Sequence, residues 1–241
     1  MAAATTGPRD HIERIRRERY YIGREEKNPL AEDIHQAVNY LSEELYSKDV
    51  HFLMELIQVV VLNIFLVLSL FAVMAALRMD SMNSNAEDNK YKEGVTPSLE
   101  FVITSKDITM TGAGSTLLLF NNEIGLKSPA NIDSICRIGK STKKGRRHLG
   151  YIGEKGFKSV FLISSKPHIF SNGYQIRFDE EPSPDCNLGY IVPEWVESNP
   201  NLSDIQNIYG SSKSLPSTTI ILPLKSEKES SYFFLKLDNY L

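Results

Sequence analysis

Residues 137–158 form a segment with the sequence RIGKSTKKGRRHLGYIGEKGFK, which is rich in Lys and Arg and contains one acidic residue, Glu154. Glycine lets a backbone approach its ligand closely, and backbone N–H groups at a helix start favour anions. A basic loop of this kind suits a polyanion such as a triphosphate. A solvated basic loop without a ligand is the alternative that these residue types leave open.

Two other stretches carry amide and hydroxyl groups at the ends of apolar runs. Asn121-Asn122-Glu123-Ile124-Gly125-Leu126 follows STLLLF, and Ser217-Thr218-Thr219 opens STTIILPL. An asparagine carbonyl can accept a hydrogen bond from an amine, and a threonine hydroxyl can donate or accept one. The same residues are also common in plain turns and strands, so each stretch alone has a purely structural interpretation.

The fourth stretch is divided into two halves by an apolar run. Glu55 lies in ELIQ, and Asn85 begins NAEDN, 30 positions later. If residues 59–84 were absent, the glutamate and the asparagine would be four positions apart. That spacing places two side chains on one helix face, one turn apart.

Taken in their order along the chain, the four stretches resemble the nucleotide pocket of the GHKL ATPases, and most closely the N-terminal ATPase-like domain of the plant NO VEIN proteins, which are related to sacsin. The resemblance implies ATP and Mg²⁺ as ligands. It implies Glu55 as the catalytic base that activates water, and Asn85 and Asp88 as the residues that hold the metal. The residues that would contact the nucleotide are Asn121, Gly125, Ser141, Thr142, Gly150, Gly153, Gly156 and Thr218.

The chain departs from the pattern of the family in the split first stretch, in the glycine box, at Asn121, and at Glu123, which replaces the first glycine of its box. The family reads ELIQNAEDN without interruption, and its glycine box reads GYIGEKGIGFKSVF, which is two residues longer than the box here. Asn121 stands where most GHKL proteins have aspartate, so an adenine amine would meet a neutral carbonyl and a weaker contact. We therefore expect an ATP-binding domain that is truncated and impaired in hydrolysis.

The apolar run offers a different interpretation. Residues 59–77 contain no charged residue, and as a helix they would span about 28 Å, close to the hydrocarbon thickness of a bilayer. A single-span membrane protein is thus one alternative, and a nucleotide-free interaction module is another. A membrane span here would separate Glu55 from Asn85, so we expect 59–84 to be an inserted segment that is foreign to the family domain.

The elements that must position these residues are helical at first and β-rich later. Residues 29–46 have an apolar residue every three or four positions, which predicts a helix, and short β-rich runs follow from about residue 98. The expected fold is α+β, a two-layer Bergerat sandwich with helices on a mixed sheet. Its expected parts are N-terminal helices at 1–58, the insert at 59–84, the rest of the domain at 85–225, and an unassigned tail at 226–241.

Composition limits the remaining possibilities. The formal net charge of −3 gives no clear nucleic-acid signature. Two cysteines make no disulfide framework and suit a reducing compartment, and the polar N-terminus has no cleavable signal pattern. By resemblance we expect a nuclear or cytoplasmic location, with a membrane location as the alternative if 59–77 inserts. Protein partners are not indicated.

Overall fold

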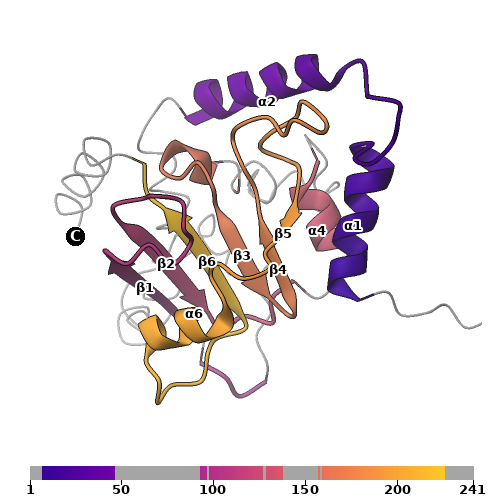
Figure 1. The fold of residues 1–241 in the computed structure, drawn as a ribbon. Helices are drawn as coiled ribbons and strands as arrows, with labels where there is room; N and C mark the ends of the chain where they lie inside the picture. The colour runs from indigo at the N-terminus through magenta and orange to yellow at the C-terminus, as the bar shows by residue number, and fades with distance from the viewer. Residues whose placement is uncertain are drawn as a thin grey trace, which may run out of the picture.

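The computed structural model describes residues 7–46, 93–96, 98–126, 129–137, 157 and 159–225. Within them it contains helices and one β-sheet (Figure 1). The helices are α1 (Pro8–Arg19), α2 (Ala31–Tyr46), α4 (Pro129–Ile135), the 3₁₀ helix η2 (Ser159–Leu162) and α6 (Leu202–Tyr209). The strands are β1 (Leu99–Thr104), β2 (Thr116–Asn121), β3 (His168–Ser171), β4 (Tyr174–Arg177), β5 (Glu194–Trp195) and β6 (Thr218–Pro223).

The sheet has six strands in the order β1-β2-β6-β3-β4-β5. The last strand, β6, lies at its centre, between β2 and β3. Its central place agrees with its sequence, since TTIILP is almost wholly apolar or β-branched and is buried along most of its length. The first residues of β6 therefore lie beside the last residues of β2 and β3.

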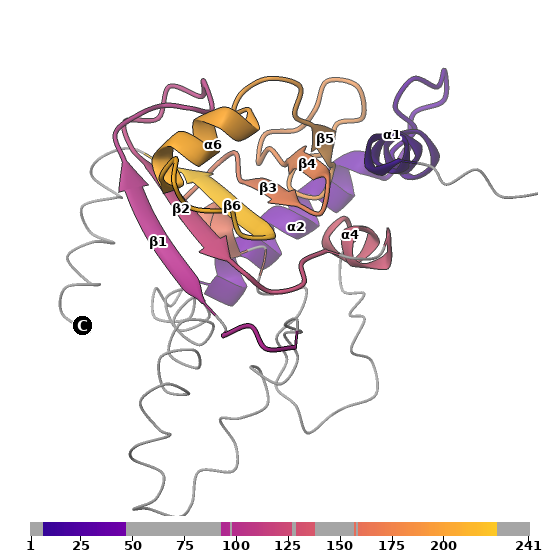
Figure 2. The same cartoon turned by 90° about the horizontal axis from the view of Figure 1, so that it is seen from below.

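One face of the sheet carries the larger hydrophobic core. Side chains of β2, β3 and β6, among them Leu119, Ile169 and Leu222, pack there with Ile12 of α1, Val38 of α2 and Ile132 of α4. Figure 2 shows these three helices on the same side of the strands. Side chains along a strand point to the two faces in turn, so every second residue of each strand contributes to this core.

The other face carries a smaller core under α6. Leu118, Phe120 and Ile221 project from the central strands and pack with Ile205 of α6. In Figure 2, α6 lies on the side of the sheet away from α2. The central strands are therefore covered on both faces, which explains the continuous burial of β2 from Thr116 to Asn121.

The prediction of an α+β protein is confirmed, and the helices on the sheet are consistent with a sandwich. The predicted mixed sheet was wrong for the described strands, because every strand pair in them is antiparallel. Part of the reason is local: β3 and β4 are joined by the two-residue Asn172-Gly173 turn, which can only connect antiparallel neighbours.

Two regions of the predicted organisation lie outside the described residues. They are the proposed insert at 59–84 and the tail at 226–241. None of the helices in the described ranges combines the length and apolar character needed to cross a membrane.

Candidate functional site

Three polar side chains lie in one row across the sheet, where β2 ends, β6 begins and β3 ends. Asn121 pairs with Thr218, and Thr218 pairs with Ser171 on its other side. All three are nearly inaccessible, with exposed fractions of 9%, 6% and 3%. The Thr218 and Ser171 hydroxyl oxygens are 2.8 Å apart and share a hydrogen bond. Two of the predicted base-contacting residues, 97 positions apart in the chain, are thus direct neighbours.

Gly125 packs against this row. Its φ angle is +77°, a left-handed conformation that glycine adopts without strain. A Cβ atom at this position would lie 2.6 Å from the Ser171 Oγ, 2.8 Å from the Asn172 Nδ2 and 2.9 Å from the Thr218 Oγ1. The next residue, Leu126, donates its backbone N–H to the Ser171 Oγ at 3.0 Å. Both the backbone angle and the close approach therefore require glycine at position 125.

The β3–β4 hairpin and the residue before β6 hold the same turn from two sides. The Asn172 side-chain amide donates to the carbonyl of Ile124 at 2.7 Å. The Ser217 hydroxyl donates to the carbonyl of Glu123. The sequence did not indicate Ser171 and Asn172 as parts of the site, and it gave Ser217 no role of its own. The Asn172-Gly173 pair by itself indicates only a turn, and nothing local in the sequence indicates that this turn reaches residues 123–126.

The side chain of Asn121 has a defined orientation. Its Oδ1 accepts the backbone N–H of Glu123 at 2.9 Å. A backbone N–H can only donate, so the atom that faces it must be the oxygen, and the amide nitrogen points elsewhere. Glu123 itself is largely buried, and this burial raises the pKa of its carboxyl group.

The row continues on the same face of the sheet towards α1 and α4. Ser171 pairs with Tyr174 in the hairpin. The Tyr174 hydroxyl lies 3.0 Å from the His11 Nδ1, and the His11 Nε2 lies 3.6 Å from a carboxylate oxygen of Asp133. Burial lowers the pKa of His11, and the nearby Asp133 carboxylate opposes this shift. These contacts connect the polar row to α4, the last described helix before residues 138–156.

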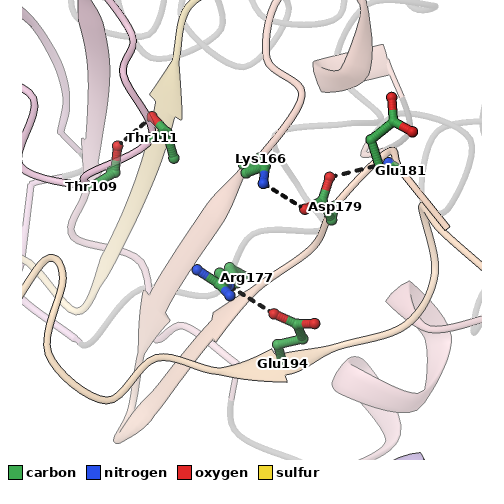
Figure 3. A network of polar contacts seen from close by, with 7 residues as sticks. All are labelled: Thr109, Thr111, Lys166, Arg177, Asp179, Glu181 and Glu194. Carbon is green, nitrogen blue, oxygen red and sulfur yellow. Dashed lines mark hydrogen bonds and ion pairs between the residues drawn. The ribbon is translucent and has the colours of Figure 1, made fainter. Parts of the chain in front are cut away.

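A separate group of polar contacts surrounds β4 and β5 (Figure 3). Arg177 and Glu194 form an ion pair of 2.8 Å between the two strands, and Lys166 pairs with Asp179 at 2.9 Å. Glu181 donates its backbone N–H to Asp179, which closes a turn. The side chains of these pairs are between a quarter and two fifths exposed. We interpret them as structural pairs of small energetic value.

The catalytic, metal and phosphate residues predicted from the sequence lie outside the described residues. They are Glu55, Asn85, Asp88, Ser141, Thr142, Gly150, Gly153 and Gly156. Within the described ranges, no group of three or more His, Cys, Asp or Glu side chains is placed to hold a metal ion. The predicted site residues that the structure describes are therefore Asn121, Gly125 and Thr218, which the resemblance assigns to the nucleotide base.

Comparison with known proteins gives one informative relative. No family model matches the chain. Over 163 residues the chain is 39% identical to Protein NO VEIN of Arabidopsis thaliana, an alignment that covers 67% of this chain and only 4% of that much longer protein. The chain is thus NO VEIN-like over two thirds of its length.

Proposed function

We propose that this chain is a nucleotide-binding domain of the NO VEIN kind, which binds ATP through a base site formed by Asn121, Gly125 and Thr218. The observation that supports it best is the convergence of these three residues. They come from separate parts of the chain, and the resemblance to the GHKL ATPases assigns the same task to all three. In the structure, Gly125 and Thr218 are in contact, and Thr218 is the cross-strand neighbour of Asn121.

The chemistry of these groups suits a purine. The row presents an amide and two hydroxyls that can hydrogen-bond the polar edge of a base, and glycine at position 125 lets the turn pack directly against the two hydroxyls. The metal and phosphate contacts would come from Asn85, Asp88 and the glycine-bearing segment Gly150–Gly156. When bound, Mg²⁺ would neutralise charge on the phosphates.

The proposal is tested by equilibrium binding of a fluorescent ATP analogue to the whole chain. Gly125→Ala should lower the affinity at least tenfold, because the new Cβ would displace the Ser171 and Thr218 side chains. Gly112→Ala is the matched control: Gly112 also has a left-handed φ angle, of +81°, but a Cβ there meets no atom within 4 Å. The control shares the backbone strain and should retain binding.

A second pair of variants tests the proposal even if the Gly125→Ala protein does not fold. Thr218→Val removes the hydroxyl that contacts Ser171 and preserves the shape of the side chain, and it should weaken binding. Thr219→Val makes the same change one position later on β6, on the opposite face of the strand. Equal affinities of the two valine variants, or no binding by the unmodified chain, would contradict the proposal and favour a nucleotide-free interaction module.

A further inference from the structure

We propose that residues 232–237 of this chain add a strand to the sheet, antiparallel to β1, and that they cover the exposed side chains of Phe101 and Ile103. These residues, YFFLKL, follow the described part of the chain. The inference concerns one edge of the sheet. It goes beyond the proposed function and does not depend on it.

The strand β1 is at the edge of the sheet, with β2 as its one neighbour among the described strands. Phe101 lies opposite the core residue Leu119, so it points to the face that carries the larger core. Ile103 lies opposite Leu117 and points to the same face. The exposed fractions of Phe101 and Ile103 are 39% and 52%, and an exposed apolar edge of this kind tends to pair with another strand.

The described chain leaves the sheet within reach of this edge. Pro223, the last residue of β6, lies beside Thr116 at the start of β2, and Thr116 lies beside Thr104 at the end of β1. Lys225 is held there by a backbone hydrogen bond of 2.9 Å to the residue after η2. A strand beyond β1 would lie three strand spacings from β6, or about 14 Å, and the connecting residues 226–231 span up to about 20 Å when extended. Their sequence, SEKESS, is polar throughout, as surface connections usually are.

The directions of the strands determine how the added strand would run. Both β6 and β1 are antiparallel to β2, so they point the same way, and β6 ends at the same end of the sheet as β1. A chain that turns back after β6 meets β1 at Thr104 and runs towards Leu99. The added strand is therefore antiparallel to β1, an arrangement that a short connection allows.

The sequence of the segment has the period of a strand. Phe233, Leu235 and Leu237 occupy every second position, and the charged Lys236 lies between two of them. A period of two is typical of a strand with one apolar face. Such a strand matches an edge whose exposed apolar side chains also lie on one face.

Charge complementarity selects one register. The carboxylate of Glu100 lies on the α6 side of the sheet, where Tyr209 and Lys213 donate to it. If Lys236 lies opposite Glu100, the two opposite charges attract each other across the strands. The same register places Phe233 opposite Ile103. A shift by one residue would turn the apolar side chains of the added strand to the wrong face.

Phe234 is the one large apolar side chain that this register directs to the α6 side. It falls opposite Val102, which packs against the smaller core. Phe234 thus also meets an apolar neighbour, and the register leaves no aromatic ring of residues 233–235 without one.

Disulfide cross-linking of the whole chain tests this register. Ile103→Cys with Phe233→Cys places two thiols on directly opposed residues, whose Cα atoms would be about 5.5 Å apart, a separation that suits a disulfide. Mild oxidation should link them within one chain. Ile103→Cys with Phe234→Cys is the matched control, because residue 234 would point to the other face, and it should give at least tenfold less linked product. The native Cys136 and Cys186 are buried, and the unmodified chain treated in the same way measures their background.

A second pair, Phe101→Cys with Leu235→Cys, follows the same register and tests the inference even if the first protein does not fold. Mass spectrometry of the linked peptides identifies the product, and non-reducing electrophoresis separates links within a chain from links between chains. No link within the chain for either pair, or equal yields for the first pair and its control, would overturn the inference. Links between two chains would show that a second copy occupies the edge, which also overturns it. None of these outcomes bears on nucleotide binding, so the proposed function stands or fails separately.

Discussion

His168 is the residue whose burial has the clearest consequence for stability. It lies at the start of the short strand β3 and is fully inaccessible. Burial lowers the pKa of His168 from 6.5 to about 4, with a smaller opposing effect from the backbone of Lys166. The folded protein therefore keeps this imidazole neutral in a range of pH where an unfolded chain would protonate it.

We predict an acid-sensitive stability that depends on His168. Between pH 6.5 and about 4 the unfolded state binds a proton that the folded state does not, so the free energy of unfolding falls as the pH falls. The loss from this residue should reach about 3 kcal/mol by pH 4, from about 1.4 kcal/mol per unit of pKa shift. Urea unfolding at several pH values would measure it.

The matched variant is His168→Phe, which fills the same buried site without a titrating group. Its free energy of unfolding should fall less steeply between pH 6.5 and 4 than that of the unmodified chain. Parallel curves for the two proteins would show that another group causes the acid sensitivity.

At the scale of the element, α6 shows how a short helix is specified locally. Asn201 is its N-cap: the Asn201 side chain accepts the backbone N–H of Asp204 at 3.0 Å, and the Asp204 carboxylate accepts the N–H of Asn201 at 3.1 Å. This reciprocal pair satisfies two N–H groups at the start of the helix. The cap positions Ile205, which is fully buried in the smaller core.

We predict that Asn201→Ala destabilises the protein by about 1 kcal/mol, the usual cost of losing an N-cap side chain. Chemical denaturation of the purified chain would give the value. Asn207→Ala serves as the control, since Asn207 lies exposed within the same helix and alanine is the better helix former there. An Asn201→Ala protein as stable as the Asn207→Ala protein would show that the cap contributes nothing.

At the scale of the whole molecule, the interruption between Glu55 and Asn85 and the short glycine box determine our expectation for catalysis. We predict ATP hydrolysis near background for the unmodified chain. Removal of residues 59–84 together with insertion of Ile-Gly after Gly156 should strengthen nucleotide binding. The deletion restores the four-residue spacing that places the glutamate and asparagine on one helix face, and the insertion restores the length of the glycine box.

Phosphate release by the purified proteins measures this prediction. Any turnover of the edited chain should disappear with Glu55→Ala, because that residue is the expected base. Hydrolysis by the unmodified chain at a rate that Glu55→Ala abolishes would contradict the prediction, since the two halves of the motif would then be working together across the insert.

Much of the secondary structure follows from local patterns. The apolar spacing of residues 34–45 predicts α2, and the β-branched run of residues 218–223 predicts β6. SVFLIS has both β-rich composition and helical signals, and the structure makes Ser159–Leu162 a 3₁₀ helix. The two-residue strand β5 was missed because it is too short for a periodic signal, and α6 was missed although its Asn201–Asp204 capping pair is a local signal.

For the candidate site, the sequence by itself determined residue types: a glycine where a turn is left-handed, and an amide and a hydroxyl at strand ends. Only the tertiary structure decided that Ser171 and Asn172 join them, because these residues lie more than 45 positions from Gly125 and meet it through the pairing of β3 with β6. It also decided the direction of the Asn121 amide, through its bond to the Glu123 N–H. Local propensities act over a few residues, whereas strand order and hydrogen-bond partners depend on which distant segments pack together.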